Sequence, residues 1–211
     1  MFETAVVAFT TFFATIGPID VAAMYAALTS RHPARLRRSM AIRGVLVATA
    51  ILLLFALSGG TLLSHLGISL AALRTAGGIL LLLIGIDMVF ARSSGGVSTT
   101  DDETEEATTK PDIAVFPLAT PLLAGPGAMG AVILLMANTA GDLRQQAIVI
   151  AMLLAVMALA FIMMMGAGSI QRILGVTGMH VVSRVFGVLL SALAVQFIFD
   201  GIATSGLLGV S

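Results

Sequence analysis

Ile16-Gly17-Pro18-Ile19 interrupts an apolar run that extends from Ala5 to Leu28. Ala124-Gly125-Pro126-Gly127 interrupts a second apolar run, from Val115 to Asn138. Each run is the first of three apolar segments in its half of the chain. Interrupted hydrophobic segments at matching positions of two halves are typical of a solute site near the middle of a bilayer. These two breaks therefore guide the interpretation of the rest of the sequence.

Six apolar segments are each long enough to cross a hydrocarbon core of about 30 Å, which needs roughly 20 helical residues. The composition agrees, because 58% of the residues are hydrophobic and only 10% are charged. The segments do not alternate between apolar and polar residues, which favours helices over the strands of a membrane barrel. The predicted spans are residues 5–28, 44–65, 70–91, 115–138, 147–168 and 181–203. The sequence thus predicts an all-α membrane protein with six transmembrane helices, the first and fourth of them broken.

The two halves of the chain resemble each other at nearly constant spacing. Pro126 follows Pro18 by 108 residues, and Arg184-x-x-Gly187 follows Arg74-x-x-Gly77 by 110 residues. Each half has three spans, an odd number, so the second half must be inserted upside down relative to the first. The sequence therefore predicts two inverted three-helix repeats, an architecture found in many secondary transporters.

A linker is predicted between the repeats. Residues 92–113 are rich in serine, glycine, threonine and acidic side chains, a composition typical of disordered connections. The predicted domains are therefore a first repeat at 1–91, an acidic cytoplasmic linker at 92–113 and a second repeat at 114–211.

The positive charges predict the orientation in the membrane. The loop between the first two spans carries five arginines, namely Arg31, Arg35, Arg37, Arg38 and Arg43. Loops on the same side carry Arg92, Lys110 and Arg172, whereas Arg144 and Arg74 lie on the opposite side. The positive-inside rule therefore places the arginine-rich loop in the cytoplasm and both termini outside.

The chemistry of the breaks predicts a binding site. Proline has no N–H, so Pro18 and Pro126 free the backbone carbonyls of Ala14 and Leu122. After each proline a half-helix begins, and its N–H groups and positive dipole end suit an anion. The alternative is a pair of proline kinks whose freed carbonyls are satisfied by neighbouring helices. The predicted substrate-binding residues are Gly17, Pro18, Asp20, Gly125, Pro126, Gly127 and Ala128.

Asp20 lies in the first turn after Pro18, about midway through its span. A charge there costs about 2.5–3.5 kcal/mol on insertion scales, so an intramembrane acid is by default a functional hypothesis. Three roles are open: binding a substrate ammonium, binding Na⁺ together with the freed Ala14 carbonyl, or carrying a proton. The remaining alternative is a helix-capping carboxylate with no part in transport.

Three polar residues are secondary candidates: Arg74, Arg184 and Gln196. The arginines lie near segment ends, where long side chains reach the interface. Gln196 is more interior and suits a hydrogen bond across helices. The histidines lack metal-ligand spacing and the chain has no cysteine, so neither a metal site nor a cofactor is predicted. The zero net charge indicates no nucleic-acid partner.

Several motifs resemble the MarC family of six-span membrane proteins. Ala119-Thr120-Pro121-Leu122-Leu123-Ala124-Gly125-Pro126-Gly127-Ala128 is similar to its central signature. Arg184-x-x-Gly187, Ala194-Val195-Gln196 and Asp200-Gly201-Ile202 are similar to its C-terminal signature. Gly17-Pro18-Ile19-Asp20 differs from the family's N-terminal pattern, which has Asn or Asp before the proline and Gly-Asn after the isoleucine.

The resemblance implies a bacterial inner-membrane protein, with some relatives regarded as transporters of small neutral amino acids. We therefore expect a transporter that works by alternating access, with the bilayer, a small solute and Na⁺ or H⁺ as partners. A channel and a structural membrane protein are the alternatives, and an oligomer is left open. An intramembrane aspartyl protease would need two close acids, but Asp87 and Asp200 fall at opposite faces, so no enzyme is expected.

Overall fold

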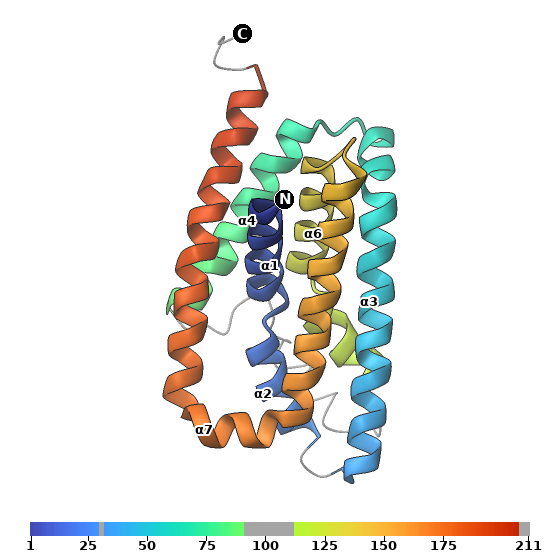
Figure 1. Ribbon diagram of the computed structural model, residues 1–211, viewed down its shortest axis with the longest axis vertical. Helices are drawn as coiled ribbons and strands as arrows, with labels where there is room; N and C mark the ends of the chain where they lie inside the picture. The colour runs from blue at the N-terminus through green and yellow to red at the C-terminus, as the bar shows by residue number, and fades with distance from the viewer. Residues whose placement is uncertain (30–31, 91–111, 207–211) are drawn as a thin grey trace.

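The computed structural model describes residues 1–29, 32–90 and 112–206, and every regular element in these ranges is a helix. The helices are α1 (Phe2–Ile16), α2 (Pro18–Leu28), α3 (Ala34–His65), α4 (Leu70–Phe90), η1 (Ala114–Leu123), α6 (Pro126–Asn138) and α7 (Leu143–Thr204). They form one elongated bundle (Figure 1). Five helical stretches are long and apolar enough to cross a membrane, or six when the bent pair of η1 and α6 is one span. The prediction of an all-α membrane protein is confirmed.

The second span begins earlier than predicted. The sequence placed its start at residue 44, but α3 begins at Ala34, so Arg35, Arg37, Arg38 and Arg43 lie on the helix and not in a loop. Hydropathy reports only the part of a helix that lies in hydrocarbon. Arginine is a good helix former, so the helix continues beyond the apolar part into the polar region.

The fifth and sixth spans belong to one helical element, α7. Its candidate spans are Leu143–Gly166 and Arg184–Thr204, here called the first and second limbs. Between the limbs the ribbon turns at one end of the bundle and runs back (Figure 1). The first limb starts at Asp142, whose carboxylate accepts hydrogen bonds from the backbone N–H groups of Arg144 and Gln145 at 2.9 and 3.1 Å. Such a cap satisfies amides that have no partner inside the helix.

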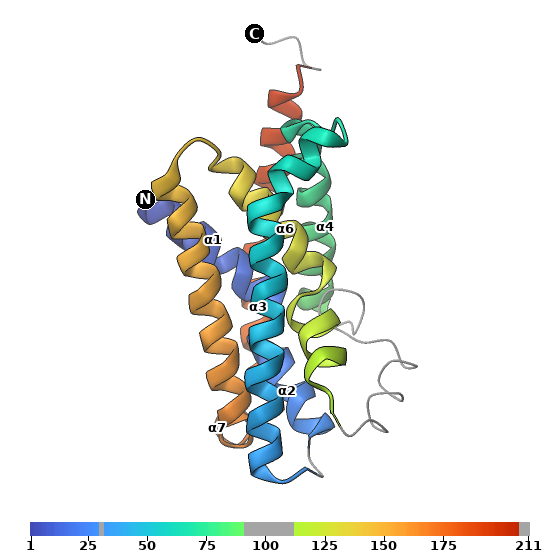
Figure 2. The ribbon, with the colours of Figure 1, turned by 90° about the vertical axis from the view of Figure 1, so that its right-hand side faces the viewer.

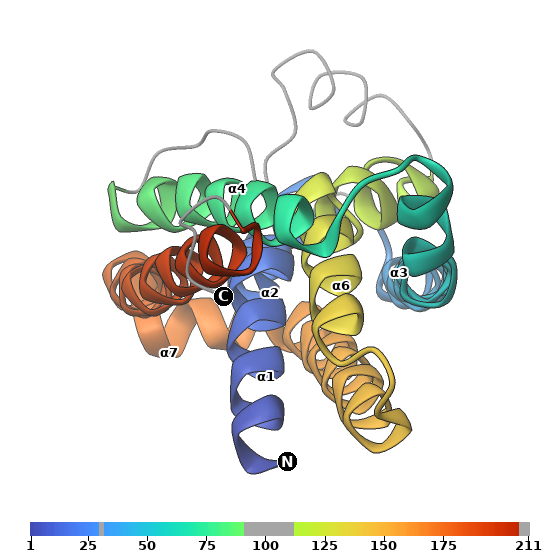
Figure 3. The same cartoon turned by 90° about the horizontal axis from the view of Figure 1, so that it is seen from above.

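The two halves of the chain interlock. The helix α3, from the first half, packs against η1 and α6, whereas α7, from the second half, packs against α1 and α2. The views from the side and from above show the same arrangement, with α3 beside α6 (Figure 2) and α1 between the limbs of α7 (Figure 3). Each half therefore covers the broken segment of the other half.

The helices α4 and α7 pack so closely that glycines are required at the contact. A Cβ atom added to Gly78 would lie 2.7 Å from the carbonyl oxygen of Ala194, and one added to Gly85 would lie 2.9 Å from that of Gly187. The higher number on α4 faces the lower number on α7, so the second limb runs antiparallel to α4. An inverted repeat would pair its third helices in this way, so the packing is compatible with one.

The ends of the bundle alternate as expected for a multi-pass chain. The α3–α4 and α6–α7 connections lie at the same end as the C-terminus, and the start of α3 and the turn of α7 lie at the other (Figures 1 and 2). Large apolar side chains such as Leu54, Leu57 and Ile162 are exposed on the flanks, where lipid would cover them. The predicted linker lies outside the described residues except for positions 112 and 113.

Labelling of single cysteines tests the orientation. Ser39 is exposed near the start of α3, and Ser69 is exposed in the α3–α4 connection. In this cysteine-free chain we expect Ser39→Cys to react with a membrane-impermeant thiol reagent only from the cytoplasmic side, and Ser69→Cys only from outside. Reversed reactivity would overturn the orientation, and reaction of both from one side would overturn the arrangement of the ends.

Candidate functional site

The first break is a true interruption of the helix. The α1 helix ends at Ile16, and Gly17 follows in the left-handed conformation, with φ 60° and ψ 59°. A residue with a Cβ atom adopts this conformation only at a cost, which explains glycine here. Pro18 then starts α2 at the one helical position where its missing N–H loses nothing. The sequence-based prediction of a discontinuous first helix is confirmed.

The second break is longer than predicted. The π-helical element η1 contains two residues with extended dihedrals, Phe116 (φ −129°, ψ 126°) and Thr120 (φ −132°, ψ 130°). Each directly precedes a proline, and proline disfavours helical dihedrals in the residue before it. The sequence analysis centred this break on Pro126 alone, but Pro117 and Pro121 extend the irregular backbone through the whole first half of the span. The axis bends by 54° between η1 and α6.

The helix α6 begins at this break with an open N-terminus. Gly125 is the N-cap residue and supplies no side-chain hydrogen bond to the first turn. Gly127 and Ala128, whose amides belong to that turn, are both buried. A helix start with buried, uncapped N–H groups and a positive dipole end can bind an anion.

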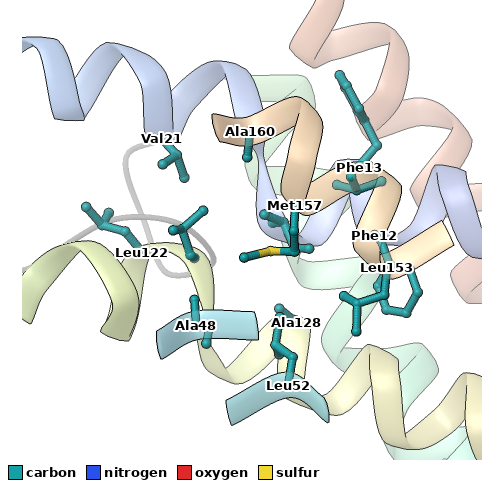
Figure 4. Close-up of a cluster of buried hydrophobic side chains, with 14 of the residues drawn as sticks. Phe12, Phe13, Val21, Ala48, Leu52, Leu122, Ala128, Leu153, Met157 and Ala160 are labelled. Carbon is teal, nitrogen blue, oxygen red and sulfur yellow. The ribbon is translucent and has the colours of Figure 1, made fainter. Parts of the chain in front are cut away.

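The two broken segments contact each other inside the bundle. The α1 helix packs against α6, and α2 packs against η1. Gly17, Pro18, Gly125 and Ala14 are buried. Figure 4 shows Val21 of α2, Leu122 of η1 and Met157 of α7 in one cluster of buried hydrophobic side chains around this region. The structure thus brings the two sets of predicted residues into neighbouring parts of the interior.

Two of the predicted residues are not buried. Asp20 and Pro126 are exposed, whereas their neighbours Val21 and Gly127 are buried. The Asp20 side chain therefore lies at the surface of the bundle, on the first turn of α2, and not in the interior with the amides of α6. Simultaneous contact of both groups with one solute would require α2 and α6 to move relative to each other.

The secondary candidates divide. Arg74 is half-buried and donates a hydrogen bond to Oδ1 of Asn138 at the end of α6, so it joins two helices and does not merely reach the interface. Arg184 is exposed, as expected for an arginine near a span end. Gln196 was expected to bond across helices, but it is exposed and donates to Asp200 on its own helix at 2.8 Å. That expectation was wrong because residues four apart on a helix are already neighbours.

An ion pair that the sequence analysis missed joins the two halves. Arg43 of α3 contacts the carboxylate of Asp112 at 2.7 Å, and Asp112 also accepts a hydrogen bond from the backbone N–H of Ala114, at the start of η1. These interactions, led by the Ala114 hydrogen bond, lower the pKa of Asp112 below its usual value. Asp112 therefore remains charged, and the pair intact, down to more acidic pH than an isolated aspartate would allow.

A second repeated feature appears at the ends of the half-helices. The buried hydroxyls of Thr29 and Thr139, 110 residues apart, donate to the carbonyls of Tyr25 and Leu135 four residues earlier. The spacing equals that of the two Arg-x-x-Gly motifs, so the sequence contained this match. No group of three potential metal-binding side chains is found among the residues that the structure describes.

Comparison with known proteins agrees with the architecture. The model of the MarC family of integral membrane proteins matches residues 2–205. A UPF0056 membrane protein of Methanocaldococcus jannaschii is 38% identical over 93% of this chain and 95% of its own length. A UPF0056 membrane protein of Bacillus subtilis is 33% identical over 96% of this chain and 95% of its own length. No solved structure matches.

The family match and these relatives cover nearly the whole chain, including both breaks and the helices that enclose them. The protein is thus a multi-pass integral membrane protein that belongs to the MarC family.

Proposed function

We propose that the protein transports small neutral amino acids, or similar small zwitterions, across the bacterial inner membrane by alternating access. The observation that carries the proposal is the contact between two interrupted helices inside the bundle. Interrupted helices expose backbone groups at membrane depth, and such groups are tolerated where protein, water or a ligand satisfies them.

The α6 N-terminus would bind the carboxylate of the solute. The N–H groups of Gly127 and Ala128 point toward the break, and neither carries a side chain larger than a methyl group. The small residues on both sides of Pro126 leave room for a solute such as glycine, alanine or serine and disfavour larger side chains.

Asp20, helped by the Ala14 carbonyl, would bind the ammonium of the solute or a coupling cation. Asp20 is exposed in this conformation while the α6 amides are buried. Rocking of the two interlocked halves would bring α2 and α6 into alternate positions and expose the bound solute to one side at a time. Coupling to Na⁺ or to H⁺ would follow from occupation of the same carboxylate.

Flux measurements test this function. Protein in proteoliposomes is expected to take up labelled glycine, alanine or serine faster than protein-free vesicles, and an imposed Na⁺ or proton gradient should raise the rate. Unlabelled solute inside the vesicles should accelerate uptake, because a carrier exchanges solutes whereas a channel does not. Flux without such acceleration would favour a channel. Uptake no greater than that of empty vesicles, for all three solutes and both gradients, would overturn the proposal.

A further inference from the structure

Thr11 differs from the other helical hydroxyl residues for which a bond is seen. Seven of these donate to the carbonyl four residues earlier, namely Thr15, Thr29, Ser58, Thr75, Thr139, Ser191 and Thr204. Thr11 is 0% exposed, yet its Oγ1 atom has no hydrogen-bond partner. A helical threonine can satisfy its hydroxyl by bonding to its own helix, so this side chain is turned away from the usual solution.

Leaving that hydroxyl unsatisfied is costly. A buried polar group without a partner costs about 1–3 kcal/mol in a folded protein. Inside a bilayer no lipid group can replace the missing partner. The arrangement is therefore expected where something else, absent from the closed protein, binds the group for part of the time.

The position of Thr11 on α1 indicates where that partner would come from. Thr4, Ala8, Thr11 and Thr15 are spaced by four, three and four residues, so they share one face of the helix, here called the threonine face. This face carries only small or hydroxyl-bearing side chains. It runs from the end of α1 near the N-terminus to Thr15, two residues before the break at Gly17.

The threonine face is closed at its outer end. The Thr4 hydroxyl donates to Oε1 of Gln145, in the first limb of α7, at 3.1 Å. Further in, Thr15 is 1% exposed and its hydroxyl is occupied by the Thr11 carbonyl at 2.8 Å. Thr11 therefore holds the only hydroxyl on the described part of this face whose hydrogen-bonding capacity is unused.

We propose that the threonine face lines the route of the solute between the membrane side that carries the N-terminus and the break, and that the Thr11 hydroxyl accepts a hydrogen bond from the solute's ammonium group. The inference rests on the transport function proposed above. Opening the route requires separation of Thr4 from Gln145, which exposes the face between α1 and α7. The carboxylate of the same small zwitterion would then reach the α6 amides.

Cysteine accessibility tests the route without knowledge of the solute. In the full-length, cysteine-free chain, Thr11→Cys and Ala8→Cys should react with a small, impermeant, cationic thiosulfonate added on the N-terminal side. The matched control is Ala194→Cys, which is equally buried but lies in the α4–α7 contact. We expect both threonine-face variants to react at least about tenfold faster than this control, as a hydrated path predicts. Equal rates, or reaction of Thr11→Cys only from the opposite side, would overturn the route.

Protection separates this inference from the proposed function. Millimolar glycine, alanine or serine should slow the modification of Thr11→Cys if the residue contacts the transported solute. Fast modification that none of the three solutes slows would support the route, but it would overturn the Thr11–ammonium contact and count against amino acids as substrates.

Removal of the hydroxyl gives a second test. Thr11→Val keeps the shape and removes an unsatisfied group, so the ligand-free protein should melt at a higher temperature while the KM for the transported amino acid rises about tenfold, the loss expected for a hydrogen bond to a charged group. Thr11→Ser should retain the wild-type KM. The control Thr29→Val removes a satisfied buried hydroxyl and should lower the melting temperature without changing KM. An unchanged KM in Thr11→Val would overturn the contact with the solute.

Discussion

Gly85→Ala is expected to destabilise the protein by about 1–3 kcal/mol, the usual range for overpacking a filled interior. The added methyl group would press on the Ser191 hydroxyl, on the Ser191 backbone nitrogen at 3.0 Å and on the Gly187 carbonyl at 2.9 Å. Two of these three atoms belong to the backbone of α7, so no side-chain rotation relieves the contact. The helices α4 and α7 must instead move apart, and other contacts along their interface weaken as they do.

Gly60→Ala is the matched control. Gly60 also lies inside a helix, α3, but a Cβ atom added there meets nothing within 4 Å. The same substitution should therefore stabilise the protein by about 0.5–1 kcal/mol, because alanine loses less conformational freedom than glycine in a helix. Thermal unfolding in detergent, followed by far-ultraviolet circular dichroism, measures both. Melting temperatures that shift in the same direction would show that the α4–α7 contact is looser than the structure indicates.

Asp20→Asn is expected to abolish cation-coupled flux while the protein still folds. Asparagine keeps the size of the side chain and can still cap the first turn of α2, but it carries no charge to attract an ammonium group or Na⁺ and no proton to exchange. Removal of a charge from a span should, if anything, favour insertion into the membrane. The measurement is uptake of labelled amino acid with and without an imposed gradient, at matched amounts of reconstituted protein.

Asp200→Asn serves as the control for this experiment. Asp200 is likewise an exposed aspartate within a span, but it accepts a hydrogen bond from Gln196, which an asparagine oxygen can also accept. Its flux and gradient dependence should match the wild type. Asp20→Asn with unchanged flux and unchanged gradient dependence would show that Asp20 only caps α2.

Features set by neighbouring residues were predictable from the sequence. The apolar segments gave the spans, and Gly17-Pro18 and Gly125-Pro126 gave the positions at which two of them are broken, since proline and glycine act on the backbone locally. The start of α3 was missed because arginine-rich turns are helical without being apolar. The extent of the second break was missed because Pro117 was assigned to a helix start, although proline also restricts the residue before it.

Features set by distant contacts were not predictable. Nothing near Arg43 in the sequence indicates that it would pair with Asp112, and nothing near Arg74 indicates Asn138. Burial is also a property of the packed bundle, so an unpaired hydroxyl at Thr11 and an exposed carboxylate at Asp20 could not be distinguished by residue type. The predicted roles of the break residues themselves remain predictions.

The antiparallel contact of α4 with the second limb of α7 has a consequence for ancestry. Its glycine contacts centre between residues 78 and 85 on one helix and between 187 and 194 on the other, positions separated by the same spacing as the two Arg-x-x-Gly motifs. Two copies of one three-helix peptide, threaded through the membrane in opposite directions, would meet at such a self-complementary seam. The seam is thus what a dual-topology homodimer would leave behind after duplication and fusion of its gene, with the chain between the halves as the later addition.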